Sequence, residues 1–220
     1  KKLCIIPFPK VIIERLKQFK KDKVDYDTDK KQFDYHDFIK PEKIFKIPDN
    51  VKLRDYQIEA INGWEQQGYK GIFSMSTGSG KSFTALACMA HLAEKVDEKL
   101  AVFIVCPYIH LVGQWEEDVV NWACNPIIAH SKSSDKKWDL NLVKAYKRFR
   151  NNGKPFVCIT TNDTFASEKI QNIIHRLNEE QNVLLIIDEA HNFGSVRLSN
   201  MLPENIKYRI ALSATIKRHM

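Results

Sequence analysis

The sequence predicts an α/β domain with a doubly wound, mostly parallel sheet and helices on both faces. Three observations predict this fold class: short, nearly continuous apolar runs, segments of helical periodicity between them, and polar clusters directly after most of the runs. Strands of a parallel sheet are apolar along their whole length because helices cover both faces. Alternation of such strands with helices requires successive right-handed crossovers, which produce a doubly wound sheet.

Five apolar runs rich in β-branched residues are predicted strands: Gly71–Ser76, Leu100–Cys106, Phe156–Thr161, Val183–Ile187 and Arg209–Leu212. Five other segments have apolar residues at helical spacing and are predicted helices: Asp55–Gln67, Lys81–Val96, Ile109–Trp122, Leu140–Arg150 and Phe165–Glu179. Ligands of doubly wound sheets bind at the carboxyl ends of the strands. We therefore expect the polar residues that follow the strands to form the functional site.

Residues 1–50 differ in pattern from the rest of the chain. A helical pattern over residues 11–20 is followed by a charged and aromatic stretch over residues 21–31, and no strong core signal is present. We predict a small N-terminal appendage or connector over residues 1–50 and one α/β domain over residues 51–220. A separate recognition or nuclease module at residues 1–50 is the alternative.

The composition narrows the functional classes. The chain has 220 residues, with 34 Lys and Arg against 27 Asp and Glu, for a net charge of +7. This balance favours a polyanionic partner such as nucleic acid. No apolar run approaches the ~20 residues of a membrane helix, and no signal-peptide pattern is present. We expect an intracellular protein without a membrane partner, whose five cysteines are reduced thiols.

The segment Ser76–Ser82 lies between a predicted strand and a predicted helix, the context of a phosphate-binding P-loop. Its glycines let successive backbone N–H groups turn towards phosphate oxygens, and the following helix adds the positive end of its dipole. Lys81 is expected to reach the β- and γ-phosphates, and the Ser82 hydroxyl to ligate Mg²⁺. Met75 stands where the general pattern has glycine, and an ordinary glycine turn is the alternative. The predicted nucleotide-binding residues are Thr77, Gly78, Ser79, Gly80, Lys81 and Ser82.

Asp188 and Glu189 follow the apolar run Val183–Ile187. An acidic residue at the tip of a buried strand is costly without a facing cation, and Mg²⁺ bound to a triphosphate is such a cation. We predict that Asp188 holds the metal and that Glu189 orients and deprotonates the attacking water, which makes Lys81, Asp188 and Glu189 the catalytic residues. An Asp that caps the next turn is the alternative.

Ser76–Ser82, Asp188–His191 and Ser213–Thr215, in this order and each after a strand, resemble motifs I, II and III of superfamily-two DEAH-box helicases and translocases. The resemblance covers about residues 51–220. It implies a RecA-like P-loop NTPase domain, the N-terminal motor domain, with ATP and Mg²⁺ as cofactors. It also implies that His191, Ser213 and Thr215 couple the nucleotide state to the grip on nucleic acid.

Three further segments extend the resemblance. Leu53–Gln57 resembles the adenine-recognition element, which implies that Gln57 hydrogen-bonds the adenine edge while Arg54 and Tyr56 bracket the nucleotide. The Gln57 amide also complements the N6/N7 edge of adenine chemically. Pro107–Trp115 resembles motif Ia, and Thr160-Thr161 the next strand-end motif. In the family these motifs contact the sugar-phosphate backbone, which implies the nucleic-acid-binding residues Pro107, Gln114, Trp115, Thr160 and Thr161.

The motif combination resembles the motor subunits of restriction enzymes and DNA-repair translocases more than the RNA-directed DEAD-box group. DNA, and duplex DNA in particular, is therefore the expected substrate. Two alternatives stay open: an RNA helicase, and a nucleotide-dependent switch or scaffold that does not act on nucleic acid. Such motors use a second RecA-like domain with arginine fingers, and this chain stops five residues after Thr215. We expect the chain alone to bind nucleotide weakly and to hydrolyse it slowly.

Overall fold

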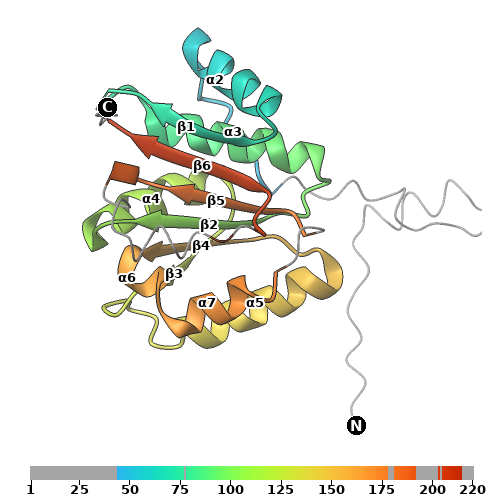
Figure 1. Ribbon diagram of the computed structural model, residues 1–220, viewed down its shortest axis with the longest axis vertical. Helices are drawn as coiled ribbons and strands as arrows, with labels where there is room; N and C mark the ends of the chain where they lie inside the picture. Colours follow the sequence, from blue (N-terminus) through green and yellow to red (C-terminus); the bar gives the residue numbers. More distant parts are fainter. Residues whose placement is uncertain (1–43, 77, 178–180, 192–202, 204, 215–220) are drawn as a thin grey trace, which may run out of the picture. The chain divides into compact units, whose positions relative to one another are not determined.

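The computed structural model describes residues 44–76, 78–177, 181–191, 203 and 205–214. Its strands form one six-stranded sheet in the order β1-β6-β5-β2-β4-β3, and every neighbouring pair is parallel (Figure 1). The elements are, in chain order, α2 (Asp55–Gln66), β1 (Lys70–Ser74), α3 (Lys81–Lys95), β2 (Ala101–Cys106), α4 (Ile109–Trp122), β3 (Ile127–Ala129), α5 (Trp138–Asn152), β4 (Phe156–Thr161), α6 (Asn162–Phe165), α7 (Glu168–Ile174), β5 (Val183–Ile187) and β6 (Tyr208–Ser213). The predicted fold class is confirmed.

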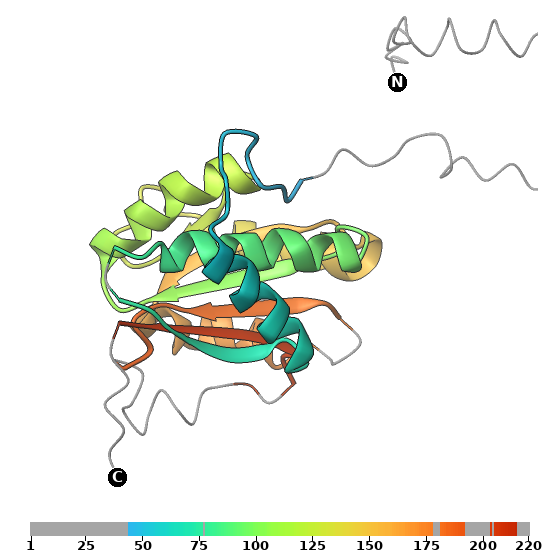
Figure 2. The same ribbon diagram turned by 90° about the horizontal axis from the view of Figure 1, so that it is seen from above.

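Two hydrophobic cores fill the two faces of the sheet. The side chains of β2 alternate between them: Val102 and Ile104 face the core formed with α2, α3 and α4, and Phe103 and Val105 face the core formed with α5, α6 and α7. Figure 2 shows α3 and α4 together on one side of the sheet. Every residue of β2 is buried because both faces are covered, and this accounts for the continuous apolar runs in the sequence.

The structure corrects the prediction in two places. The predicted helix Phe165–Glu179 is wrong: the chain forms two short helices, α6 and α7, with a break at residues 166–167. The Thr161 hydroxyl caps α6 by accepting from the Thr164 N–H, and the Ser167 hydroxyl donates to the Thr164 carbonyl at 2.6 Å. Such side-chain bonds compete with helix continuation. The second difference is β3, a three-residue strand that is not among the predicted strands.

Residues 44–46 pack against the α/β domain. Phe45 is fully buried in the core beside α3 and α4. The Glu98 carboxylate accepts from the backbone N–H groups of Ile44 and Phe45 at 3.1 and 3.0 Å, and the Lys46 N–H donates to the Trp122 carbonyl at 2.9 Å. The chain divides into two units, Lys1–Pro41 and Glu42–Met220, and all the described residues belong to the second.

Two expectations about the interior and the surface can be compared with the structure. Cys88, Cys106 and Cys158 are buried free thiols, as predicted, and burial raises the pKa of each. Within the described ranges, no helix is both long enough and apolar enough to cross a membrane.

An ionic cluster joins α2 to α3 on the surface. The Glu65 carboxylate accepts from Lys95 Nζ at 2.9 Å and from the Tyr69 hydroxyl at 3.0 Å, and its other oxygen lies 2.7 Å from His91 Nε2. The hydrogen bonds from Lys95, His91 and Tyr69 lower the pKa of Glu65 to about 2. A carboxyl group with a lowered pKa in the folded state stabilises that state above its ordinary pKa of about 4.5.

We expect Glu65→Gln to lower the thermal midpoint at neutral pH. The difference from the wild type should shrink as the pH falls from about 4.5 towards about 2, because the wild-type carboxylate is protonated in this window. Thermal unfolding followed by circular dichroism across this pH range checks it. Glu59→Gln, an exposed residue on the same helix, is the control. A Glu65→Gln effect no larger than the control at neutral pH contradicts the prediction.

Candidate nucleotide-binding site

The sheet topology brings the predicted motifs to one edge. β6 lies between β1 and β5, with Ser74 opposite Ser213 and Ala211 opposite Ile187. The P-loop follows β1 and Asp188 follows β5, so they leave the same edge of the sheet from strands about 10 Å apart, two strand spacings. The Met75 N–H donates to the Ser213 carbonyl at 3.1 Å and ties the start of the P-loop to the end of β6. Thr215 lies outside the described residues.

The P-loop has the backbone that its glycines predict. Gly78 and Gly80 have φ angles of 79° and 82°, values that residues with a Cβ adopt only with strain. The loop closes around the Ser76 carbonyl, which accepts from the backbone N–H and the hydroxyl of Ser79 at 3.2 and 2.7 Å. Lys81 Nζ donates to the same carbonyl at 3.4 Å. Thr77 lies outside the described residues.

Helix α3 begins at Lys81, directly after the loop. The N–H groups of its first turn have no carbonyl partners within the helix, and its dipole places partial positive charge at this end. Ser82 lies in that first turn and is half-buried. The end of α3 therefore combines backbone donors, an ammonium group and a hydroxyl group, which suits a polyphosphate with a bound metal ion.

Asp188 is held at the tip of β5 by three hydrogen bonds. Its backbone N–H donates to the Val105 carbonyl at 2.8 Å, which continues the pairing of β5 with β2. Its Oδ1 accepts from the Glu189 N–H at 2.9 Å, and its Oδ2 accepts from Trp115 Nε1 at 2.9 Å. Each carboxylate oxygen can accept more than one hydrogen bond or metal contact. The buried Asp188 carboxylate thus keeps acceptor capacity beyond the bonds that hold it.

Glu189 has features of a functional residue. Its φ angle is 45°, which is uncommon for a residue other than glycine. Its Oε2 is buried without a hydrogen-bond partner among the described residues, although His191 Nδ1 lies 3.3 Å away. A buried carboxylate oxygen with unused acceptor capacity fits a group that receives a proton from water.

The predicted adenine-recognition element contacts the P-loop. The Gln57 amide is buried: its oxygen accepts from the Arg54 N–H at 2.9 Å, and its nitrogen lies 3.1 Å from the Thr84 hydroxyl and 3.4 Å from the Gly80 carbonyl. The Tyr56 hydroxyl donates to the Ser79 carbonyl at 2.5 Å. Gln57 therefore keeps one acceptor position for adenine, while its amide nitrogen is already engaged inside the protein.

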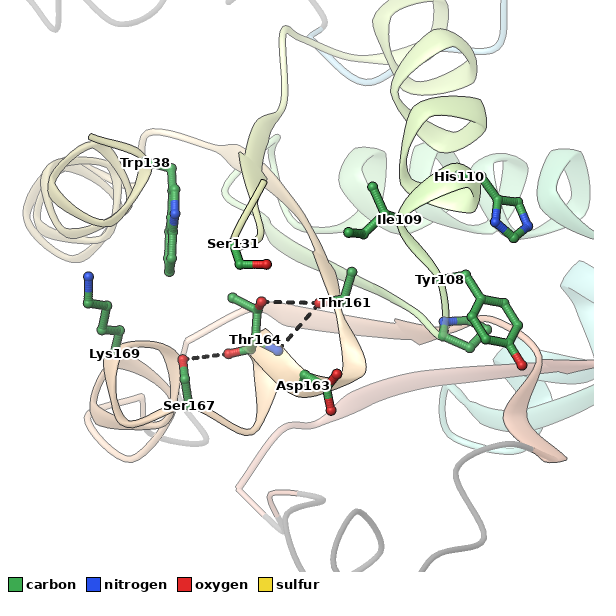
Figure 3. A pocket seen from close by; sticks show the side chains of 11 residues that line it. Tyr108, Ile109, His110, Ser131, Trp138, Thr161, Asp163, Thr164, Ser167 and Lys169 are labelled. Carbon is green, nitrogen blue, oxygen red and sulfur yellow. Dashed lines mark hydrogen bonds between the residues drawn. The ribbon is translucent and has the colours of Figure 1, made fainter. Parts of the chain in front are cut away.

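Beside the nucleotide site, the ends of β2 and β4 border a cavity of about 630 Å³ (Figure 3). Pro107 and Thr161, both predicted to contact nucleic acid, line it, and Gln114 is exposed further along α4. The lining also includes Tyr108 and His110, which lie within the segment that resembles motif Ia, and Trp138, Thr164 and Lys169, which no sequence motif singles out. Tyr108 and His110 stack at the start of α4, whereas Trp138 and Lys169 come from segments with no recognisable motif.

Two predicted nucleic-acid contacts lie in the interior instead. Trp115 is 2% exposed, because it belongs to the buried stripe Val112, Trp115, Val119 and Trp122 of α4. Thr160 is fully buried, and its hydroxyl donates to the Ala129 carbonyl at 2.7 Å. Neither side chain reaches a surface where a nucleic acid could lie. The structure therefore places these two side chains in the core and not on the cavity lining, and it gives Trp115 a polar neighbour, Asp188.

Comparisons with known proteins agree with this arrangement. The chain is 38% identical over 176 residues to "DNA 3'-5' translocase XPB2" of Sulfurisphaera tokodaii, covering 78% of this chain and 33% of the relative. It is 25% identical over 180 residues to "Chromatin-remodeling ATPase INO80" of Gibberella zeae, covering 76% of this chain and 9% of that protein. The chain therefore spans about a third or less of these curated relatives.

Solved structures share the fold. The "Sulfolobus solfataricus SWI2/SNF2 ATPase core in complex with dsDNA" superposes with a TM-score of 0.56 at 21% identity, covering 81% of this chain and 35% of that one. The type ISP restriction-modification enzyme LlaGI, solved with a DNA substrate mimic, gives a TM-score of 0.55 at 21% identity, covering 75% and 18%. Residues 50–218 match a family model. The protein therefore belongs to the family described as "Type III restriction enzyme, res subunit".

Proposed function

We propose that this chain is the first motor domain of an ATP-dependent DNA translocase or helicase. The observation that carries the proposal is the strand order β1-β6-β5, which puts the P-loop, Ser213 and Asp188 at one edge of the sheet. The relatives support DNA as the track, since one is named a DNA translocase and two solved neighbours contain DNA or a DNA mimic. An RNA helicase is the second candidate.

Each residue of the site has a proposed role. Lys81 and the N–H groups at the start of α3 bind the β- and γ-phosphates, with Gln57, Arg54 and Tyr56 on the nucleoside side. Ser82 and Asp188 would hold Mg²⁺, which would supply positive charge that stabilises the phosphates during the reaction. Glu189 orients the attacking water and accepts its proton. His191, Ser213 and Thr215 are proposed to relay the nucleotide state to the nucleic acid.

A second RecA-like domain is proposed to complete the site. Its arginine residues would supply charge to the γ-phosphate in trans, a contribution of about 10³ or more in rate. Closure of two domains around ATP, with DNA held across both, would produce movement along the strand.

The cavity at the ends of β2 and β4 is proposed to take the nucleic-acid backbone. Thr161 and Thr164 hydroxyls and the Lys169 ammonium group are suited to phosphate oxygens, which position a strand without reading its bases. Lys169 is paired with Asp139 and lies over the Trp138 ring, 5.4 Å from its centroid.

We expect Lys169→Gln to weaken DNA binding and to make it less sensitive to salt. Removal of one phosphate contact should reduce the slope of log affinity against log salt by about 0.9. Fluorescence anisotropy with labelled duplex DNA at several salt concentrations measures this slope. Lys147→Gln, an exposed lysine of α5 that does not line the cavity, is the matched control. A slope that Lys169→Gln leaves unchanged contradicts the placement of DNA in this cavity.

The experiment that tests the function is ATP hydrolysis, with and without nucleic acid, by a protein that contains this domain together with the second RecA-like domain. A DNA motor should hydrolyse ATP faster with duplex DNA than without it, and more strongly than with RNA of the same length. Displacement of a third strand from a DNA triplex then reports movement along the duplex. Hydrolysis that no nucleic acid stimulates would support the alternative of a nucleotide-dependent switch. Stimulation by RNA alone would support the RNA helicase.

A further inference from the structure

A buried hydrogen bond links helix α4 to the carboxylate at the tip of β5. Trp115 Nε1 donates to Asp188 Oδ2 at 2.9 Å, and the two residues are 2% and 8% exposed. They are 73 positions apart in the sequence, so no local pattern brings them together. We propose that Trp115 is a positioning residue for the ATPase reaction, whose indole N–H fixes the carboxylate that holds Mg²⁺. This inference rests on the proposed ATPase function.

The hydrogen bonds around Asp188 leave its side chain little freedom. The backbone is fixed by the bond from its N–H to the Val105 carbonyl. One carboxylate oxygen accepts from the Glu189 N–H and the other from Trp115. The Glu189 bond joins adjacent residues of one turn, whereas Trp115 belongs to the hydrophobic core and comes from a different element. Without the indole, a buried carboxylate oxygen would lose its donor and the side chain would be free to rotate.

Trp115 packs in the core and also donates a hydrogen bond from its indole. The buried stripe of α4 requires only a large apolar side chain at residue 115, and Val112 and Val119 fill it without a polar atom. Trp122 provides the comparison on the same helix. It is also 2% exposed and packs edge-on against Phe83 with ring centroids 5.7 Å apart.

A positioning role and a merely structural role predict different results. If the indole N–H only satisfies a buried carboxylate, its removal lowers stability and leaves the response to metal unchanged. If it positions Asp188, its removal weakens the contribution of Mg²⁺ to nucleotide binding. Partners that orient the residues around a metal commonly contribute about 10-fold or more to metal affinity. The metal-dependent part of nucleotide affinity is thus the quantity to measure.

The test compares Trp115→Phe with Trp122→Phe. Isothermal titration calorimetry with the non-hydrolysable analogue AMP-PNP gives its affinity in Mg²⁺ and in EDTA. We expect Trp115→Phe to lower the ratio of these affinities about 10-fold and to leave the affinity in EDTA unchanged. Trp122→Phe should leave the ratio at the wild-type value. An unchanged ratio in Trp115→Phe overturns the positioning role while the ATPase proposal stands.

A spectroscopic readout on the wild type covers the case in which Trp115→Phe does not fold. The sequence has four tryptophans, so the ¹⁵N-labelled protein gives few indole signals. Single Trp→Phe variants at the other three positions assign the Trp115 signal by elimination. We expect the Trp115 indole signal to shift when Mg²⁺ is added to the AMP-PNP complex and the Trp122 signal to stay. No shift of the Trp115 signal overturns the proposal. A wild type that binds no AMP-PNP in Mg²⁺ overturns the ATPase function together with the inference.

Discussion

Glu189→Gln is expected to reduce the rate of ATP hydrolysis by about 10²–10⁴-fold, the usual contribution of a general base, without weakening ATP binding. Glutamine keeps the shape of the side chain but cannot accept a proton from water. In the structure Glu189 Oε2 is buried, has no hydrogen-bond partner among the described residues and lies 3.3 Å from His191 Nδ1. Single-turnover hydrolysis of labelled ATP measures the chemical step, and calorimetry measures binding.

Glu117→Gln provides the matched control for this experiment. Glu117 is an exposed residue of α4, away from the P-loop and from the end of β5. Its substitution should leave hydrolysis at the wild-type rate. If Glu189→Gln also retained most of the wild-type rate, Glu189 would not be the base, and its strained backbone would need another explanation. If Glu189→Gln also lost ATP binding, the Glu189 carboxylate would stabilise the bound ATP and not the transition state of hydrolysis.

The sequence predicts best those strands and helices whose burial or apolar spacing is visible in their own residues. β2, β4 and β5 are buried along their whole length, and their apolar runs mark them within a residue at each end. Helix α4 coincides with its predicted bounds, since its buried stripe has helical spacing throughout. β3 has only three residues and pairs with β4 alone among the described strands. Its position depends on that partner, and so its own sequence carries too little signal.

The break between α6 and α7 shows that hydrogen bonds from polar side chains can end a helix where the spacing of apolar residues predicts that it continues. Phe165, Ile170, Ile173 and Ile174 are all buried, as a continuous helix also requires. The Ser167 hydroxyl nevertheless bonds to the Thr164 carbonyl, and α7 begins after Ser167. Periodicity records which side chains face the core, but it does not record where the backbone changes partners. Serine and threonine near a helix end should therefore be considered together with the spacing of apolar residues when the ends of a helix are predicted.

The residues of the candidate site also differ in how well the sequence predicts them. The P-loop was predictable because its glycines, Lys81 and Ser82 are adjacent in sequence and their roles follow from backbone geometry. The direction in which a helical side chain points was harder to predict than the P-loop. Trp115 was assigned to nucleic acid from its motif, yet its helical position places it inside beside Asp188. The hydrophobic stripe of α4 was visible in the sequence and could have corrected this assignment.

Lys81→Ala is expected to lower ATP hydrolysis by about 10²–10³-fold, the usual effect of removing one preorganised charge stabiliser, and to weaken ATP binding. Among the described residues, Lys81 Nζ donates only to the Ser76 carbonyl, at 3.4 Å, a bond that phosphate oxygens can replace with little loss. Because this bond is long and the side chain half-buried, the substitution should change the free energy of unfolding by no more than about 0.5 kcal/mol. Thermal unfolding measures this change in stability.

Lys81→Arg separates charge from geometry. If the site requires only a positive charge near the phosphates, arginine restores most of the rate. If it requires a compact ammonium group between the loop and α3, arginine fails, because its planar guanidinium group is larger and binds in a different geometry. We expect failure, since Ser76 and Ser79 close the loop with hydrogen bonds of 2.7 and 3.2 Å and leave it little freedom to widen. Wild-type hydrolysis in Lys81→Arg would show that this loop is adaptable and that charge alone is required.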